Sequence, residues 1–147
     1  MYYTAVIWID SDDTYSVRFP DLPGCFSTGD TLDAARASAR EALNLYLEGT
    51  PVKAFDKPKA IDNLDGYNDF KSRYIEAFPI KVNRNIAFAL KLRWQREFQG
   101  LTQAAMAQRL GVRLSAYQRL ENPEKSNDTL KTVQQLEEAI SEELLTV

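Results

Sequence analysis

Residues 101–121 read LTQAAMAQRLGVRLSAYQRLE and predict two short helices joined by a tight turn. Thr102 is a typical N-cap residue for the first helix. Gly111 permits a positive φ at the turn, and Val112 is expected to fill the corner between the helices. The positions expected to face inward are Ala105, Met106 and Leu110 in the first helix and Ala116, Tyr117 and Leu120 in the second. Their helical spacing indicates that the two helices pack against each other.

Charge is strongly segregated along the chain, whose formal net charge is −3. Residues 1–80 carry 8 Lys and Arg against 13 Asp and Glu, residues 81–121 carry 8 against 2, and residues 122–147 carry 2 against 6. A basic block inside an acidic protein is typical of nucleic-acid contact, although a solvated basic helix carries the same charge. Together with the glycine turn, the block favours a helix-turn-helix whose second helix enters the DNA major groove.

The stretch resembles the lambda-repressor-like (Cro-type) helix-turn-helix family. The residues that carry the resemblance are Leu101, Thr102, Gln103, Leu110, Gly111, Val112, Arg119 and Glu121. The sequence departs from the family pattern at Arg113 and Leu114, where a Ser and a polar residue are usual, and at Met106, where Leu is commoner. Leu114 either contacts a thymine methyl group or packs within the protein, and both interpretations stay open.

The resemblance implies roles at the DNA. Thr102 and Gln103, at a helix N-terminus, would hold a phosphate. The residues that would face base edges or the nearby backbone are Arg113, Ser115, Ala116 and Gln118. Gln118 is the best candidate for adenine recognition, because its amide can pair with two adenine nitrogens at once. Arg119 would either contact DNA or form a structural ion pair with Glu121. Because one such unit contacts little DNA, a dimer or higher oligomer is expected.

The first part of the chain alternates apolar and polar residues in two runs, 2–10 and 15–19, which predicts an antiparallel hairpin. On residues 2–10, one face carries Tyr3, Ala5, Ile7 and Ile9. The PDLPG sequence at 20–24 ends the second strand, and residues 25–28 are expected to form a short third strand. The aromatic residues expected on the hairpin are Tyr2, Tyr3, Trp8 and Tyr15.

A helix of about sixteen residues follows, with Thr31 as N-cap, Asp33 in its first turn and Gly49 near a C′ position. Its apolar stripe consists of Leu32, Ala35, Ala39, Leu43, Tyr46 and Leu47. The polar residues expected to face water or a partner are Arg36, Arg40, Glu41, Asn44 and Glu48. The stripe must cover one face of the sheet, because neither element can bury its apolar side alone.

The remaining segments complete an α+β chain of two domains. Residues 50–73 are expected to be irregular with one short helix, and residues 74–82 to form an edge strand because of Pro79. Asn83 or Asn85 would cap a helix that ends near Phe98. A final helix beginning at Asp128 or Thr129 would serve as core or as a dimer contact. The predicted domains are a β-β-β-α-β domain over 1–82 and an all-α helix-turn-helix domain over 83–147.

The first third of the chain resembles the N-terminal domain of HicB antitoxins. The resemblance rests on Phe19-Pro20-Asp21-Leu22-Pro23-Gly24-Cys25, Gly29-Asp30-Thr31-Leu32, Ala42-Leu43 and Tyr46-Leu47-Glu48-Gly49. It implies a truncated RNase H-like fold without nuclease activity that binds and blocks a small HicA-type RNA-cleaving toxin. The chain would also repress its own operon through operator DNA.

The resemblance also implies that the toxin is a basic protein, and the negative charge of the first domain suits such a partner. We expect the contact on the exposed hairpin face, the 20–24 turn and the acidic helix end, with Asp21, Leu22, Pro23 and Glu48 as candidate residues. The alternative is that Asp21 and Pro23 only shape the turn.

The chain contains no histidine, which excludes Ser-His-Asp and Cys-His catalysis and His-ligated metal sites. We therefore predict no enzyme activity, no catalytic residue, no metal and no cofactor. One alternative is a nuclease in which Asp10, Asp12 and Asp13 hold Mg²⁺, although these residues also make an ordinary hairpin turn. The other is a transcriptional regulator that senses a small molecule beside the PDLPG turn.

The expected location is the cytoplasm, with no membrane contact. No apolar run approaches the roughly 18 residues that a bilayer span requires, and the first residues lack the basic region of a secretory signal. The single Cys25 agrees with a reducing compartment.

Overall fold

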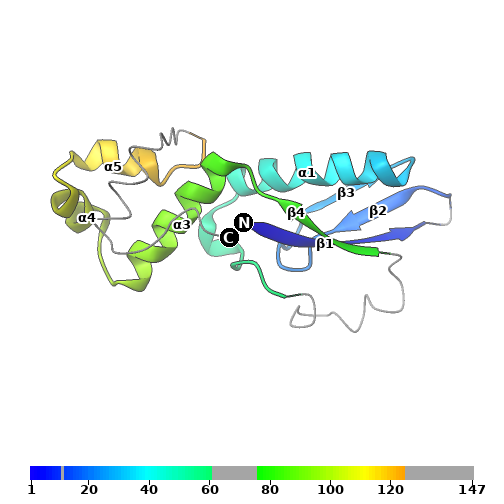
Figure 1. Cartoon of the computed structure of the whole chain (residues 1–147), viewed down its shortest axis with the longest axis horizontal. Coiled ribbons are helices and arrows are strands. Elements are labelled where there is room, and N and C mark those ends of the chain that lie inside the picture. Colours follow the sequence, from blue (N-terminus) through cyan, green and yellow to red (C-terminus); the bar gives the residue numbers. More distant parts are fainter. Residues whose placement is uncertain (11, 61–75, 125–147) are drawn as a thin grey trace. The chain divides into compact units, whose positions relative to one another are not determined.

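The computed structural model describes residues 1–10, 12–60 and 76–124. Its contacts divide the chain into two compact units, a first unit Met1–Val82 and a second unit Asn83–Val147, drawn in Figure 1. The assignment of separate functions to the two predicted domains stays a prediction. Within the described ranges, no helix is long and apolar enough to cross a membrane.

The first unit contains a four-stranded antiparallel sheet in the order β3-β2-β1-β4. The strands are β1 (Tyr2–Ile9), β2 (Tyr15–Arg18), β3 (Phe26–Gly29) and β4 (Glu76–Lys81). With α1 (Leu32–Gly49) between β3 and β4, the predicted β-β-β-α-β order is confirmed. The predicted edge strand is also confirmed, because β4 carries Pro79 and lies at one end of the sheet.

Helix α1 lies along one face of this sheet (Figure 1). The hydroxyl oxygen of Thr31 accepts a hydrogen bond from the Ala34 N–H at 3.1 Å, so the predicted N-cap is confirmed. The fully buried residues of the helix stripe are Ala35, Ala39, Leu43 and Leu47. Among the described residues between α1 and β4, the η1 turn (Val52–Ala54) is a short helix in the segment where one was expected. Residues 61–75 lie outside the described part.

Two details of α1 differ from prediction. Asn44 is buried instead of facing water, and its Nδ2 donates to the Arg40 carbonyl at 2.9 Å, which satisfies the amide inside the fold. The helix has 18 residues and includes Gly49, and Thr50 ends it in an extended conformation. The predicted C′ role of Gly49 is therefore wrong.

The core of the first unit forms between α1 and one face of the sheet. Tyr3, Ala5 and Ile7 are completely buried, and their cross-strand partners include Ile80 and Val17. The Tyr3 hydroxyl donates to the Asp56 carbonyl at 2.7 Å, and burial raises the pKa of this phenol. Tyr3 is consequently a core residue and not part of an aromatic surface.

The second unit begins with three helices, α3 (Arg84–Phe98), α4 (Gln103–Leu110) and α5 (Leu114–Leu120). Its buried apolar cluster consists of Phe88, Leu92, Met106, Ala107 and Tyr117. Asn83, one of the two predicted candidates, occupies the N-cap position of α3, although its side chain makes no capping hydrogen bond. Gly111 has φ +69° at the end of α4, as predicted. The predicted final helix at 128–144 lies outside the described residues.

Two apolar residues of the second unit point differently from expectation. Val112 keeps 42% of its surface exposed, and only its backbone N–H turns inward, to the Ala107 carbonyl at 3.0 Å. Ala116 is exposed, because the large ring of Tyr117 takes the inward position of α5. The predictions that Val112 fills the corner and that Ala116 packs inward are therefore wrong.

Gly29 offers a sharp test of the packing of α1 on the sheet. A Cβ atom at Gly29 would lie 2.4 Å from the Ala35 backbone nitrogen, far inside contact distance. We expect Gly29→Ala to lower the free energy of unfolding by about 1–3 kcal/mol or more, measured by urea denaturation of the full chain.

Gly49→Ala is the matched control, because nothing lies within 4 Å of the added atom and the position is helical. This control should be neutral or stabilising by up to about 1 kcal/mol. Equal effects of the two substitutions would contradict the close approach of α1 to β3.

Candidate DNA-binding and partner-binding sites

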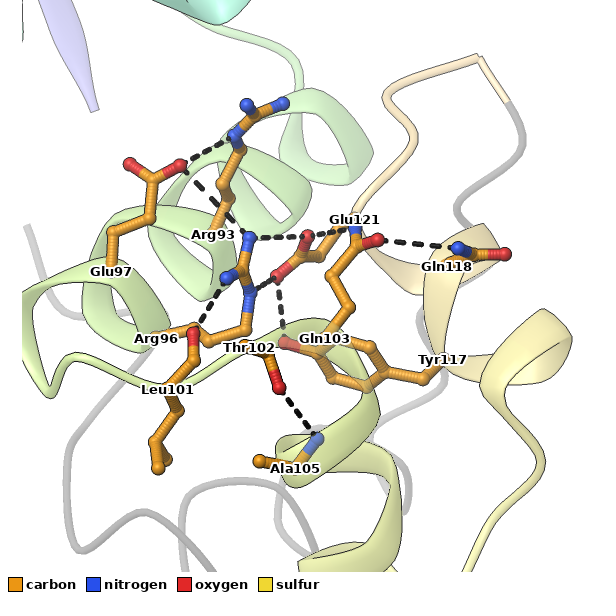
Figure 2. A network of polar contacts seen from close by, with 10 residues as sticks. All are labelled: Arg93, Arg96, Glu97, Leu101, Thr102, Gln103, Ala105, Tyr117, Gln118 and Glu121. Atoms are coloured by element: carbon orange, nitrogen blue, oxygen red, sulfur yellow. Dashed lines mark hydrogen bonds and ion pairs between the residues drawn. The ribbon is translucent and has the colours of Figure 1, made fainter.

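The carboxylate of Glu121 is the centre of a buried polar network in the second unit (Figure 2). Arg96 donates to both carboxylate oxygens, through Nε at 2.5 Å and Nη2 at 3.2 Å. The Tyr117 hydroxyl donates at 2.7 Å, and the Gln103 Nε2 donates at 2.7 Å to the other oxygen. Each oxygen therefore accepts two hydrogen bonds, although only 5% of Glu121 is exposed.

Arg96 joins this network to the start of the helix-turn-helix. Its Nη1 donates to the Leu101 carbonyl at 2.7 Å, and hydrogen bonding to Glu121 raises the pKa of the guanidinium. Burial, reinforced by the hydrogen bond to Glu121, raises the pKa of Tyr117. Glu121 is therefore engaged by Arg96, Gln103 and Tyr117 and not by Arg119. Of the two alternatives for Arg119, the structural ion pair with Glu121 is wrong.

A hydrogen-bond relay runs from this buried carboxylate to the protein surface. A carboxylate can only accept, so the Gln103 amide must turn its Nε2 toward Glu121. The Gln103 Oε1 then accepts from the Gln118 Nε2 at 3.2 Å (Figure 2). The orientation of the Gln118 amide is thereby set from the core, which leaves its Oε1 and a second N–H for other partners.

The residues predicted to contact DNA lie on α5 and around the N-terminus of α4. Those that are exposed are Thr102, Arg113, Ser115, Ala116, Gln118 and Arg119. The Thr102 hydroxyl accepts from the Ala105 N–H at 3.1 Å, which confirms its capping role. Gln103 is only half-buried, with its side chain held between Glu121 and Gln118. The sequence did not identify Arg96, whose role depends on a partner 25 positions away.

The PDLPG corner is held from inside the first unit. Leu22 is 1% and Asp21 is 6% exposed, and a carboxylate oxygen of Asp21 accepts from the Lys59 N–H at 3.0 Å. Pro23 is exposed, and its carbonyl accepts from the Tyr46 hydroxyl at 2.8 Å. Asp21 and Leu22 are buried in the first unit, whereas Pro23 is exposed and Glu48 is half-buried; the partner contacts expected at these four residues stay a prediction.

Phe26, next to this corner, was not among the predicted partner residues, yet it is 72% exposed. It lies on β3, which forms an edge of the sheet. In the sequence, Phe26 is a large aromatic residue in a short strand that follows two prolines and a glycine. This pattern does not indicate whether the ring points into the core or toward solvent.

The aspartates at the hairpin end make turn contacts. Asp10 accepts from Trp8 Nε1 and from the Ser16 hydroxyl. Asp12 accepts from the Thr14 N–H at 3.2 Å and hydroxyl at 2.6 Å, and these bonds lower the pKa of Asp12. Across the described ranges, no group of three or more His, Cys, Asp or Glu is arranged to hold a metal ion. The turn itself therefore accounts for the contacts of Asp10 and Asp12.

Comparison with known proteins adds the family. Residues 3–89 match the family described as the HicB-like antitoxin of bacterial toxin–antitoxin systems. The chain belongs to this family. Residues 92–145 match a helix-turn-helix family, so the HicB-like part is joined to a helix-turn-helix of the DNA-binding type in one chain.

Individual relatives cover parts of the chain. An uncharacterised 14.9 kDa protein of Haemophilus phage HP1 is 45% identical over 49 residues, 33% of this chain and 37% of the phage protein. The chain therefore spans little more than a third of that relative. A UPF0150 protein of Thermoplasma acidophilum is 44% identical over 48 residues, 33% of this chain and 70% of its own. The crystal structure of Burkholderia pseudomallei antitoxin HicB has 20% identity and a TM-score of 0.48, covering 79% of this chain and 98% of that one.

The buried ion pair predicts a large difference between two neighbouring arginines. Arg96→Met strands the Glu121 charge, so we expect the free energy of unfolding to fall by about 3–5 kcal/mol. Thermal and urea denaturation of the full chain, followed by circular dichroism, measure this loss.

Arg93→Met is the matched control, because Arg93 pairs with the exposed Glu97 at 3.0 Å on the same helix. Such an exposed pair contributes about 0–1 kcal/mol. A loss for Arg96→Met no larger than that of the control would show that the buried network is unimportant.

Proposed function

We propose that the chain is an antitoxin that binds and neutralises a small HicA-type ribonuclease and represses its own operon by binding operator DNA. The observation that carries the proposal is the joining, in one chain, of a HicB-like match over 3–89 and a helix-turn-helix match over 92–145. Because the same chain would bind the toxin and repress the operon, the amount of toxin and antitoxin present would control the synthesis of both.

The second unit supports the DNA-binding half of the proposal. Residues 81–121 hold 8 Lys and Arg against 2 Asp and Glu, a charge that favours a phosphate backbone. Helix α5 exposes Ser115, Gln118 and Arg119. Thr102, the N-cap of α4 in the same helix-turn-helix motif, is exposed as well. A dimer or higher oligomer would place two such helices on a palindromic operator.

The first unit supports the toxin-binding half. Its residues 1–80 carry 13 Asp and Glu against 8 Lys and Arg, which complements a basic ribonuclease. The accessible candidates for contact are Pro23, Glu48, Tyr2 and Phe26. The proposed location of both activities is the cytoplasm.

Gln118 provides the test of DNA recognition. Gln118→Ala should weaken binding to the selected operator by about 1–3 kcal/mol and leave binding to random DNA nearly unchanged, because the amide would read a base and not a phosphate. Fluorescence anisotropy with both duplexes at several salt concentrations measures the two affinities.

Gln108→Ala is a suitable control, because Gln108 is an exposed glutamine on α4 outside the relay. Absence of any salt-sensitive DNA affinity in the full chain would refute the repressor half of the proposal. A monomer by light scattering, both alone and with the operator, would count against the symmetric complex.

Growth rescue tests the toxin-binding half. The full chain, co-expressed with a small basic HicA-type ribonuclease whose gene lies next to its own, should restore growth and co-purify with that ribonuclease. Glu48→Lys should weaken the rescue, because it places a positive charge at the acidic helix end facing a basic partner.

Glu41→Lys is the control on the same helix, at an exposed position away from that end. It makes the same charge change and should still protect. If the folded chain neither binds nor protects, the antitoxin proposal fails and sensing of a small molecule becomes the leading hypothesis.

A further inference from the structure

Two large aliphatic side chains stand exposed at the N-terminal end of α5. Leu114 keeps 43% and Val112 keeps 42% of its surface exposed. Three other leucines of the second unit, Leu101, Leu110 and Leu120, pack against the apolar cluster. Leu114 therefore differs from these three leucines because its side chain stays exposed to solvent and is available to a partner.

The position of Leu114 relates it to the candidate base-reading residue. Leu114 and Gln118 are four residues apart in the same helix, so their side chains are neighbours on one face, a little more than one turn or about 6 Å apart along the axis. Arg113 and Arg119 are exposed at the two ends of the helix. The apolar side chain thus lies on a face flanked by positive charge, which suits a polyanion.

We propose that Leu114 contacts the 5-methyl group of a thymine in the major groove and makes the chain selective for that base. This inference rests on the proposed DNA-binding function. The thymine methyl is the apolar group among the features that B-DNA base pairs present in the major groove, the others being hydrogen-bond donors and acceptors. An exposed leucine on a groove-entering helix has no other apolar group on the bases to cover.

The relay from Glu121 places the preferred thymine near an adenine. Because the Gln118 Nε2 donates to Gln103, its Oε1 and second N–H are the groups left for the exocyclic amine and N7 of adenine. One turn of the protein helix advances about 5.4 Å, which is longer than the rise of about 3.4 Å from one base pair to the next. The thymine read by Leu114 therefore lies within about two base pairs of the adenine read by Gln118.

The experiment removes the methyl group from the DNA and the side chain from the protein. A duplex selected from a randomised pool by the full chain serves as the probe, and each thymine in one half-site is replaced singly by deoxyuracil. At one position the affinity of the unchanged protein should fall about threefold to tenfold, the size expected for one buried methyl group.

Leu114→Ser should weaken binding to the thymine duplex and abolish the difference between thymine and deoxyuracil at that position. Leu114→Met should keep the difference, because it retains an apolar side chain of similar size. Phe98→Ser removes a side chain on α3 that is 82% exposed and should also keep the difference. Circular dichroism establishes that each variant is folded.

Two results overturn the proposal: indifference of the unchanged protein to deoxyuracil at every position, or full sensitivity retained by Leu114→Ser. If deoxyuracil has no effect but Leu114→Ser lowers the oligomer mass in light scattering, a second copy of the chain covers the side chain and the proposal is wrong. If no duplex binds in a salt-sensitive manner, the proposed function itself has failed, an outcome distinct from loss of thymine selectivity alone.

Discussion

A carboxylate removed from water constrains the three described helices of the second unit. Glu121 is 5% exposed, and a charge buried to that degree is tolerated only when donors replace the lost water. The donors come from α3, from the first residue of α4 and from α5. None of these three segments can move without leaving the charge partly unsatisfied, so the carboxylate constrains their mutual placement in addition to the apolar packing.

This constraint extends to the surface because hydrogen bonds have direction. The acceptor-only character of Glu121 determines which end of the Gln103 amide faces inward, and Gln103 then determines which end of the Gln118 amide faces it. A side chain on the exposed face of α5 thereby takes its orientation from the core. Preorganisation of this kind reduces the ordering cost when a partner binds.

Local chemistry predicted much of the fold, and long-range contacts account for what it missed. The caps Thr31 and Thr102 and the turn at Gly111 follow from a few neighbouring residues, and the structure has them as predicted. The partner of Glu121 could not be predicted from sequence, because Arg96 lies 25 positions away. The burial of Asp21 likewise depends on a backbone N–H 38 positions away, at Lys59.

In the first unit, too, a local sequence pattern identified the family but did not show which residues its side chains contact. The PDLPG stretch carries the likeness to HicB antitoxins, but the structure uses Asp21 and Leu22 to hold the corner, one through Lys59 and the other through the core. A motif can therefore identify a family because it shapes a turn, while the side chains that are exposed to solvent lie beside it. Pro23, which the sequence placed on the accessible turn, and Phe26, whose exposure no local pattern revealed, are the exposed side chains beside that corner. A substitution at Phe26 would then leave in place the contacts of Asp21 and Leu22 that hold the corner.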